Sequence, residues 1–403
     1  MAALTPISRK PLSFVLPTAA AAGGGFGLFL GTGNGAGLIG VLLGAAVIAA
    51  IAYGFIVVIK NEGLAKWISI VGFAFVGYIY SGVVLAVIAG LIGMFYHWLI
   101  YWLYEGRYRA KLLPYLTPGQ VAWHYGFRCI AGVIFIFLIT PILVIIPLSF
   151  NAQDFFTYTP GMLRLDPDAY SLKHYQDFFT NNEWQRSMKN SLIIAPFATI
   201  ISVSLGTLAA VGLSQSHMPF KGTIMAILIS PMIVPLIISA TGMFFFYSDL
   251  GNFMENTLGM SKNFAGYIKV ILAHAVLGIP FVIITVTATL VGFDQSLTRA
   301  AANMGAGPLT TFFRIQMPLI LPGVISGGLF AFITSFDEVV VVLFVGSAGQ
   351  KTLPWQMFTG LREQISPTIL AVATILVVVS ICLLTVVELL RRRSERLRGM
   401  SPA

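Results

Sequence analysis

The sequence predicts an all-α membrane protein that crosses the bilayer many times. Of its 403 residues, 57% are hydrophobic and only 10% are charged, whereas a soluble domain carries about 25% charged residues. Apolar runs of about 18 or more residues recur along the whole chain, and each can cross roughly 30 Å of hydrocarbon. A transmembrane β-barrel would instead show short segments of alternating hydrophobicity. Helices are therefore the expected spanning elements.

The first 120 residues are expected to form a separate membrane region of two to four helices, with four as the working number. The run 38–59 is a clear span, whereas 14–31 is rich in Ala and Gly and barely long enough. The run 67–104 has almost twice the length of a span. It forms either two short helices that turn near Tyr80–Gly82 or one long helix with an interfacial end.

Residues 121–400 are expected to form a domain of six spans. Their approximate ranges are 129–149, 190–213, 223–247, 265–291, 319–345 and 367–390. The tail Glu388–Gly399, ELLRRRSERLRG, is strongly basic, and Lys/Arg-rich flanks stay in the cytoplasm. Counting back from this tail places the polar loop 151–188 outside and the segment 293–318 in the cytoplasm.

Several function classes find no support in the sequence. The net charge of +9 does not indicate a nucleic-acid partner, because the basic residues gather between and after apolar runs, where they set topology. Cys129 and Cys382 lie inside apolar runs and are interpreted as small hydrophobic residues, not as a disulfide or metal site. No nucleophile–base pair, metal-ligand spacing or phosphate loop occurs. The chain is therefore predicted to be no enzyme and to bind no metal or cofactor.

The cytoplasmic segment 293–318 is predicted to fold as two short helices. Asp294 can cap the first helix, Gly305 suits the left-handed residue that ends it, and Pro308 suits the first position of the second. Each helix has an apolar stripe. The stripes are Leu297, Ala300, Ala301 and Met304 in the first helix, and Leu309, Phe312 and Phe313 in the second. Such a ridge is either a partner site or an amphipathic loop on the bilayer surface.

The same segment resembles the EAA loop of permease subunits in ATP-binding-cassette (ABC) importers. That motif reads E-A-A, three residues, G, nine residues, I-x-L-P, and Arg299-Ala300-Ala301, Gly305 and Ile315-Gln316-Met317-Pro318 meet every interval. Arg299 stands where the family usually has Glu, and Met317 where it has Leu. The resemblance implies that the loop couples to an ATPase. The implied coupling residues are Arg299, Ala300, Ala301, Gly305, Phe312, Ile315, Met317 and Pro318.

Flanking sequence is similar to the second-permease type of the spermidine/putrescine branch. The similar stretches are Ser230–Tyr247, Ile279–Leu297 and Ser335–Ser380, and the resemblance covers about 120–400. It implies a bacterial inner-membrane type I importer with a second permease subunit, two ATPase copies and a periplasmic solute-binding protein. ATP and Mg²⁺ would then be bound by the ATPase subunits and not by this chain.

Two acidic residues within the fifth span, Asp337 and Glu338, are the strongest candidates for a solute site, because charges inside a membrane are costly and usually functional. Neighbouring helix positions differ by about 100°, so one carboxylate can line a cavity while the other pairs at a helix interface. They either attract a cationic solute or form a buried hydrogen-bonded pair. The expected pathway residues are Asp337, Glu338, Ser335, Thr334, Thr241 and Tyr247.

The expected solute is a polyamine, which would need carboxylates and aromatic faces. However, Leu236 stands where polyamine permeases can carry an acid, so an opine or another amino-acid-like solute is the alternative. His274 in the fourth span is interpreted as a packing histidine, with a gate as the other possibility. A stand-alone secondary transporter or channel is the alternative from another class, and inverted repeats with broken helices would favour it.

Overall fold

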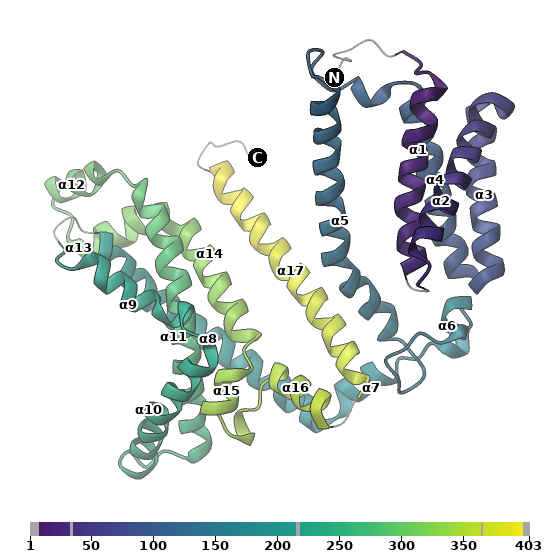
Figure 1. Cartoon of the computed structure of the whole chain (residues 1–403). Coiled ribbons are helices and arrows are strands. Elements are labelled where there is room, and N and C mark those ends of the chain that lie inside the picture. Colours follow the sequence, from purple (N-terminus) through teal and green to yellow (C-terminus); the bar gives the residue numbers. More distant parts are fainter. Residues whose placement is uncertain (1–7, 33–34, 215–217, 364–365, 398–403) are drawn as a thin grey trace. The chain divides into compact units, whose positions relative to one another are not determined.

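The computed structural model describes residues 8–32, 35–214, 218–363 and 366–397 (Figure 1). This described part is helical, with one isolated bridge between Asn151 and Tyr170 and no named strand. It contains nine helices that are long and apolar enough to cross a membrane, or ten with one bent pair. The prediction of an all-α polytopic membrane protein is confirmed. The predicted basic tail ends outside the described residues, which stop at residue 397.

The chain divides into two compact units, Met1–Ser171 (unit 1) and Leu172–Ala403 (unit 2). The sequence placed a boundary near residue 120 on the basis of the resemblance, and that functional division stays a prediction. The structural division differs because helix α5 and the following loop make their contacts within unit 1.

Unit 1 holds four consecutive helices of span length, which lie side by side in Figure 1, and a fifth, longer helix. The helices are α1 Leu12–Thr32, α2 Gly37–Tyr53, α3 Glu62–Ser81, α4 Val83–Tyr104, α5 Pro118–Leu148 and the short α6 Pro160–Arg164, with a π-turn at Gly54–Ile59 after α2. The run 67–104 is therefore two helices. They separate at Gly82, whose φ of 88° is a conformation that favours glycine.

Glycines bring α1 and α2 unusually close together. A Cβ on Gly27 would lie 2.0 Å from the Gly40 carbonyl oxygen, and a Cβ on Gly23 would lie 2.4 Å from that of Gly44. No side chain fits at these positions. Small residues that let backbones approach are the usual basis of helix pairing in membranes, so the glycine-rich composition of the N-terminal region serves packing.

Unit 2 contains the remaining helices. They are α7 Lys173–Thr180, α8 Asn182–Ser214, α9 Lys221–Ile233, α10 Leu236–Asn256, α11 Lys262–Val291, α12 Gln295–Asn303, α13 Pro308–Thr311, α14 Met317–Phe336, α15 Val340–Val345, α16 Leu353–Glu363 and α17 Thr368–Leu397. Helix α11 packs against both α8 and α14. The contact is close because a Cβ on Gly278 would lie 2.5 Å from Ser202 Oγ, and one on Gly327 would lie 2.4 Å from Thr285 Oγ1.

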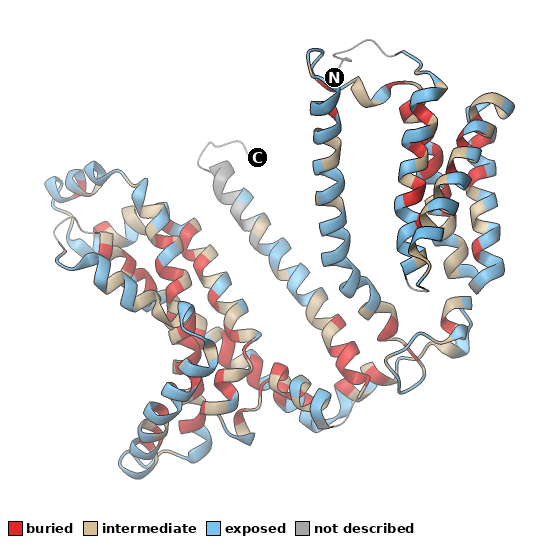
Figure 2. Cartoon of the chain, viewed as in Figure 1, coloured by how far each residue is buried: buried red, intermediate tan, exposed pale blue. Residues whose placement is uncertain are grey.

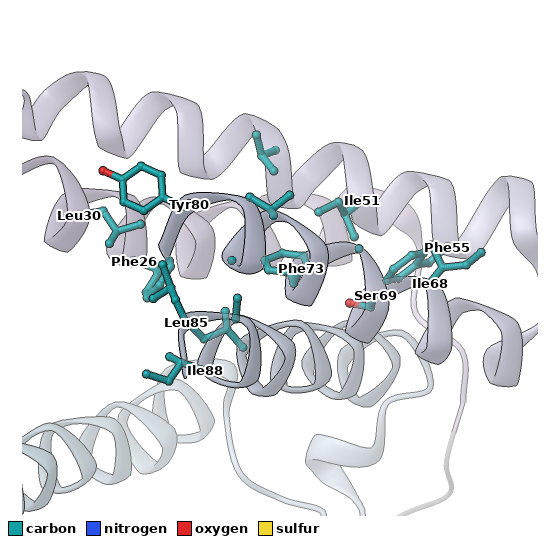
Figure 3. Close-up of a pocket in the computed structure, with 16 residues that line it drawn as sticks. Phe26, Leu30, Ile51, Phe55, Ile68, Ser69, Phe73, Tyr80, Leu85 and Ile88 are labelled. Carbon is teal, nitrogen blue, oxygen red and sulfur yellow. The ribbon is translucent and has the colours of Figure 1, made fainter. Parts of the chain in front are cut away.

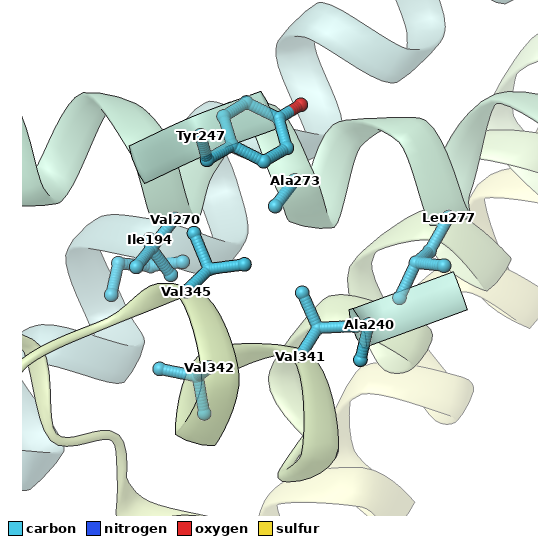
Figure 4. Close-up of a cluster of buried hydrophobic side chains, with 9 residues drawn as sticks. All are labelled: Ile194, Ala240, Tyr247, Val270, Ala273, Leu277, Val341, Val342 and Val345. Carbon is cyan, nitrogen blue, oxygen red and sulfur yellow. The ribbon is translucent and has the colours of Figure 1, made fainter. Parts of the chain in front are cut away.

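The core of unit 2 surrounds α11, where buried residues concentrate (Figure 2). Its largest cluster joins α8, α10, α11 and α15 (Figure 4). The cluster consists of Ile194, Ala240, Tyr247, Val270, Ala273, Leu277, Val341, Val342 and Val345. This core holds α15 against α10 and α11, and so fixes the chain that follows α14.

Two predicted spans are interrupted in the structure. The span 223–247 breaks between α9 and α10 with a bend of 104°, because Val234 is extended (ψ 137°) before Pro235, as residues before proline prefer. The span 319–345 ends as a helix at Phe336 and resumes as α15. That second break lies at the acidic pair Asp337–Glu338.

Candidate functional site

The segment 293–318 folds locally as the residues predict. Asp294 accepts a hydrogen bond from the Ser296 N–H at 2.8 Å and caps α12. Hydrogen bonds from Ser296 hold the pKa of the Asp294 carboxyl below its usual value, so the cap is ionised at neutral pH. Gly305 has a φ of 82° and ends the helix, and Pro308 occupies the first turn of α13.

A π-turn follows α13 and leads directly into α14. It spans Phe312–Gln316, and Gln316 Nε2 donates to Thr298 Oγ1 on α12 at 3.4 Å. The Ala306 N–H also donates to the Ala301 carbonyl oxygen at 3.0 Å. These bonds tie the two ends of the segment together.

The apolar ridge of this segment differs from the predicted stripes at two positions, because Ala301 is buried and Phe312 is half-buried. Met304, Leu309 and Phe313 are 89%, 75% and 61% exposed, whereas Ala301 is only 6% exposed. Ala301 therefore lies inside the loop, because the chain folds back over it at Ala306. We call the exposed large side chains of Leu297, Met304, Leu309 and Phe313 the coupling ridge.

The other predicted coupling residues divide by burial. Arg299, Ala300, Gly305 and Pro318 are exposed, and Phe312, Ile315 and Met317 are half-buried. The motif thus contains both half-buried residues, which pack within the loop, and exposed residues on its surface. Their role in coupling stays a prediction.

The acidic pair at the end of α14 separates into two environments. Glu338 is 7% exposed, and its Oε1 accepts a hydrogen bond from the Val341 N–H in the first turn of α15 at 2.8 Å. Asp337 ends α14, with its own N–H donating to the Ile333 carbonyl oxygen. Its side chain lines a cavity of about 280 Å³ between α14 and α17.

Aromatic rings accompany Asp337 in this cavity. Phe332 and Phe336 stack with ring centroids 5.5 Å apart and an interplanar angle of 20°, and α17 supplies a hydroxyl from Ser380. The other lining residues are apolar, namely Ile333, Leu376, Val379, Leu383 and Leu384. A carboxylate beside aromatic rings is chemistry suited to an organic cation. We call this the Asp337 cavity.

The remaining predicted pathway residues lie elsewhere. Ser335 is buried, and its Oγ and carbonyl oxygen lie 2.9 Å and 3.1 Å from His274 Nδ1. Thr334 is half-buried. On α10, Thr241 donates to the Ile237 carbonyl oxygen and Tyr247 is in the core cluster of Figure 4. The structure does not bring Thr241 or Tyr247 to the Asp337 cavity.

Phe332, Phe336 and Ser380 were not among the predicted residues. The two rings had a detectable signal, since they are four residues apart on one helix face and Phe336 directly precedes Asp337. Ser380 had none, because its approach to Asp337 depends on how α17 packs against α14.

Comparisons with known proteins agree with this architecture. Residues 202–397 match the family described as binding-protein-dependent transport system inner membrane component. The chain is 30% identical over 263 residues to the spermidine/putrescine transport system permease protein PotC of Haemophilus influenzae, covering 65% of this chain and 95% of that protein. It is 30% identical over 244 residues to the putrescine transport system permease protein PotI of Escherichia coli K12, covering 60% of this chain and 82% of that protein.

A solved structure supports the fold. A bacterial ABC transporter involved in import of the acidic polysaccharide alginate superposes with a TM-score of 0.52 at 16% sequence identity, covering 68% of this chain and 98% of the matched chain. The chain matches the family described above and covers 95% of PotC at 30% identity. It therefore belongs to the binding-protein-dependent inner-membrane permeases and is a multi-pass permease subunit of a bacterial ABC importer.

Proposed function

We propose that this permease moves a small organic cation of the polyamine class, and that Asp337 contacts the cation during transport. The observation that carries the proposal is the Asp337 cavity, where one carboxylate meets two stacked phenylalanine rings. The names of the relatives, which transport putrescine or spermidine, support the same solute class.

Asp337 and Glu338 are assigned different roles. One carboxylate oxygen of Glu338 accepts a hydrogen bond from the backbone of α15, so we assign Glu338 a structural role. Asp337 lies at the break between α14 and α15, at the end of the helix that follows the cytoplasmic segment. Movement of that segment would therefore move Asp337 relative to α17.

The coupling ridge is proposed to dock into a groove on a separate ATPase subunit. Its exposed apolar residues suit a protein groove, and its ties to α14 suit a rigid-body push. The assembly would contain two ATPase copies, which bind ATP and Mg²⁺, a second permease and a periplasmic solute-binding protein.

The test is uptake into proteoliposomes that contain the whole reconstituted transporter. Asp337→Asn keeps the shape and removes the charge. We expect it to weaken the apparent affinity for putrescine by about 1–3 kcal/mol, on the scale of a charged hydrogen bond, which is roughly a fivefold to 150-fold rise in KM. Unchanged affinity in Asp337→Asn, together with failure of Asp337→Leu, would make the residue structural and overturn the proposal.

An amino-acid-like solute is the second candidate. Asp337 is the one carboxylate in the cavity's lining within the described residues, and Leu236 adds none, whereas a diamine has two ammonium groups. Competition of labelled putrescine uptake by an opine separates the two. Uptake that only the opine competes for would assign the amino-acid-like solute.

A further inference from the structure

Unit 1 contains a large apolar groove that lies apart from the proposed solute site. Its volume is about 790 Å³, and side chains of α1, α2, α3 and α4 line it (Figure 3). Ser69 is a polar lining residue, and its hydroxyl already donates to the Gly93 carbonyl oxygen at 2.7 Å. The groove therefore presents mainly apolar surface, and the hydroxyl of Tyr80 is the other polar side-chain group in its lining.

The groove runs lengthwise along α3. Phe55, Ile68 and Ser69 lie at one end in Figure 3, and Leu30 and Tyr80 at the other. With a rise of about 1.5 Å per residue, the stretch from Ile68 to Tyr80 is roughly 18 Å long. A long, narrow apolar space within membrane helices fits an acyl chain.

One end of unit 1 is strongly basic. The start of α1 meets the end of α4 there, since the Lys10 N–H donates to the Tyr104 carbonyl oxygen at 2.7 Å. The π-turn after α2 and the start of α3 also lie at this end. Its basic residues are Arg9, Lys10, Lys60, Lys66, Arg107, Arg109 and Lys111, whereas the helix ends at 28–40 and 76–87 carry no Lys, Arg, Asp or Glu.

Two lysines at the basic end, Lys60 and Lys66, lie close to the end of the groove in the sequence and make no ion pair within the described residues. The carboxylates of Glu62 and Glu105 both pair with Arg107. Lys66 precedes Ser69 by three residues and so shares its helix face. The Lys60 N–H donates to the carbonyl oxygen of Phe55, which lines the groove.

We propose that this groove holds one acyl chain of an anionic phospholipid from the cytoplasmic leaflet, with its phosphate against Lys60 and Lys66. Basic residues at the cytoplasmic end of transmembrane helices are the usual contacts of anionic headgroups. Exposed Trp67, which follows Lys66 in the sequence, suits the interfacial level. The basic residues lie at one end of the groove only, as the anionic headgroup of a lipid requires. An apolar helix in the groove would make no favourable contact with the lysines, so we infer a lipid.

Gly72 offers a direct way to fill the groove. It lines the groove, and a Cβ there would meet no atom within 4 Å, so Gly72→Leu occupies the space without a clash. Gly25→Leu is the matched control, because Gly25 also has open space around its Cβ and is absent from the groove lining.

The experiment uses the full chain in its transporter complex, reconstituted in liposomes of phosphatidylethanolamine and phosphatidylglycerol. The probe is phosphatidylglycerol with a photoreactive group on one acyl chain, and cross-linked peptides are mapped by mass spectrometry. We expect labelling in 47–55 and 68–80, a fall of at least fivefold in Gly72→Leu, and wild-type labelling in Gly25→Leu. Equal labelling in Gly72→Leu and wild type, with both folded, would overturn the proposal.

The headgroup contact has its own readout. A probe with the same photoreactive chain on phosphatidylcholine should label the groove several-fold less, and the double variant Lys60→Gln/Lys66→Gln should lose this preference. Lys111→Gln is the matched charge control. Equal labelling by both lipids in the wild type, or cross-links from the groove to another protein helix, would overturn the lipid assignment. Neither result depends on which solute is transported.

Discussion

His274 and Ser335 join the central helix α11 to α14, with His274 Nδ1 lying 2.9 Å from Ser335 Oγ. Both residues are buried, and Ser335 is two residues before Asp337. The contact therefore holds the end of α14, where Asp337 lies, against α11. Within the described residues His274 Nε2 has no hydrogen-bond partner, so the Nδ1 contact is what anchors the ring.

We predict that Ser335→Ala lowers the thermal stability of the purified complex. Loss of the hydroxyl removes a buried contact worth about 1 kcal/mol, and the midpoint of thermal inactivation reports it. Ser204→Ala is the matched control, since the Ser204 hydroxyl is exposed and donates to the Ile200 carbonyl oxygen of its own helix. Equal stability of Ser335→Ala and Ser204→Ala would show that the His274 contact contributes little.

The glycine contact between α1 and α2 leads to a second prediction. Gly27→Leu should prevent the two helices from pairing, because even a Cβ would lie 2.0 Å from the Gly40 carbonyl oxygen. Gly25→Leu, on the same helix but in open space, should accumulate normally. Membrane abundance and protease resistance of unit 1 measure the difference, and comparable resistance of both variants would contradict the packing argument.

A third prediction concerns the N-terminal helices as a whole. Deleting residues 1–112 should reduce assembly or abundance more than the transport rate of each assembled complex. The deletion removes Gly82, which packs against Arg164 of α6, and Tyr108, whose carbonyl oxygen accepts from the Tyr125 hydroxyl of α5. Counting assembled complexes by quantitative immunoblot and dividing uptake by that number gives the comparison. A complex that assembles fully yet fails to transport would contradict a supporting role.

The sequence predicted what local patterns control and missed what distant contacts control. Apolar length is a property of single segments, so the all-α membrane fold was predictable. The cap at Asp294 and the left-handed Gly305 were predictable because each depends on neighbouring residues. The burial of Ala301 was not, since it results from the fold-back at Ala306. The approach of Ser380 to Asp337 was not predictable either, because it depends on the packing of α17 against α14, two helices that are not neighbours in the sequence.

The coupling ridge yields the fourth prediction. Met304→Glu places a charge on its most exposed residue, which an apolar groove on an ATPase cannot accept without a desolvation cost. We expect normal membrane abundance but loss of most solute-stimulated ATPase activity in the reconstituted complex. Met304→Leu keeps the apolar contact and should retain activity. By contrast, Ala301→Arg should unfold the loop itself, because Ala301 is buried. Full stimulation in Met304→Glu would remove the ridge from the coupling contact.

The fifth prediction separates the two acidic neighbours by what each bonds to. Glu338 Oε1 accepts from the Val341 N–H at 2.8 Å, and the amide oxygen of Glu338→Gln can accept the same bond. Glu338→Ala cannot, and loss of a hydrogen bond costs about 1 kcal/mol. We therefore expect Glu338→Ala to lower the thermal stability of the complex while Glu338→Gln keeps it, with the KM for putrescine near the wild-type value in both. Asp337→Asn should show the reverse pattern, with normal stability and a raised KM, because its side chain lines the cavity. Measuring both quantities on the same preparations matters, since a raised KM in Glu338→Gln at unchanged stability would place Glu338, not Asp337, in contact with the solute.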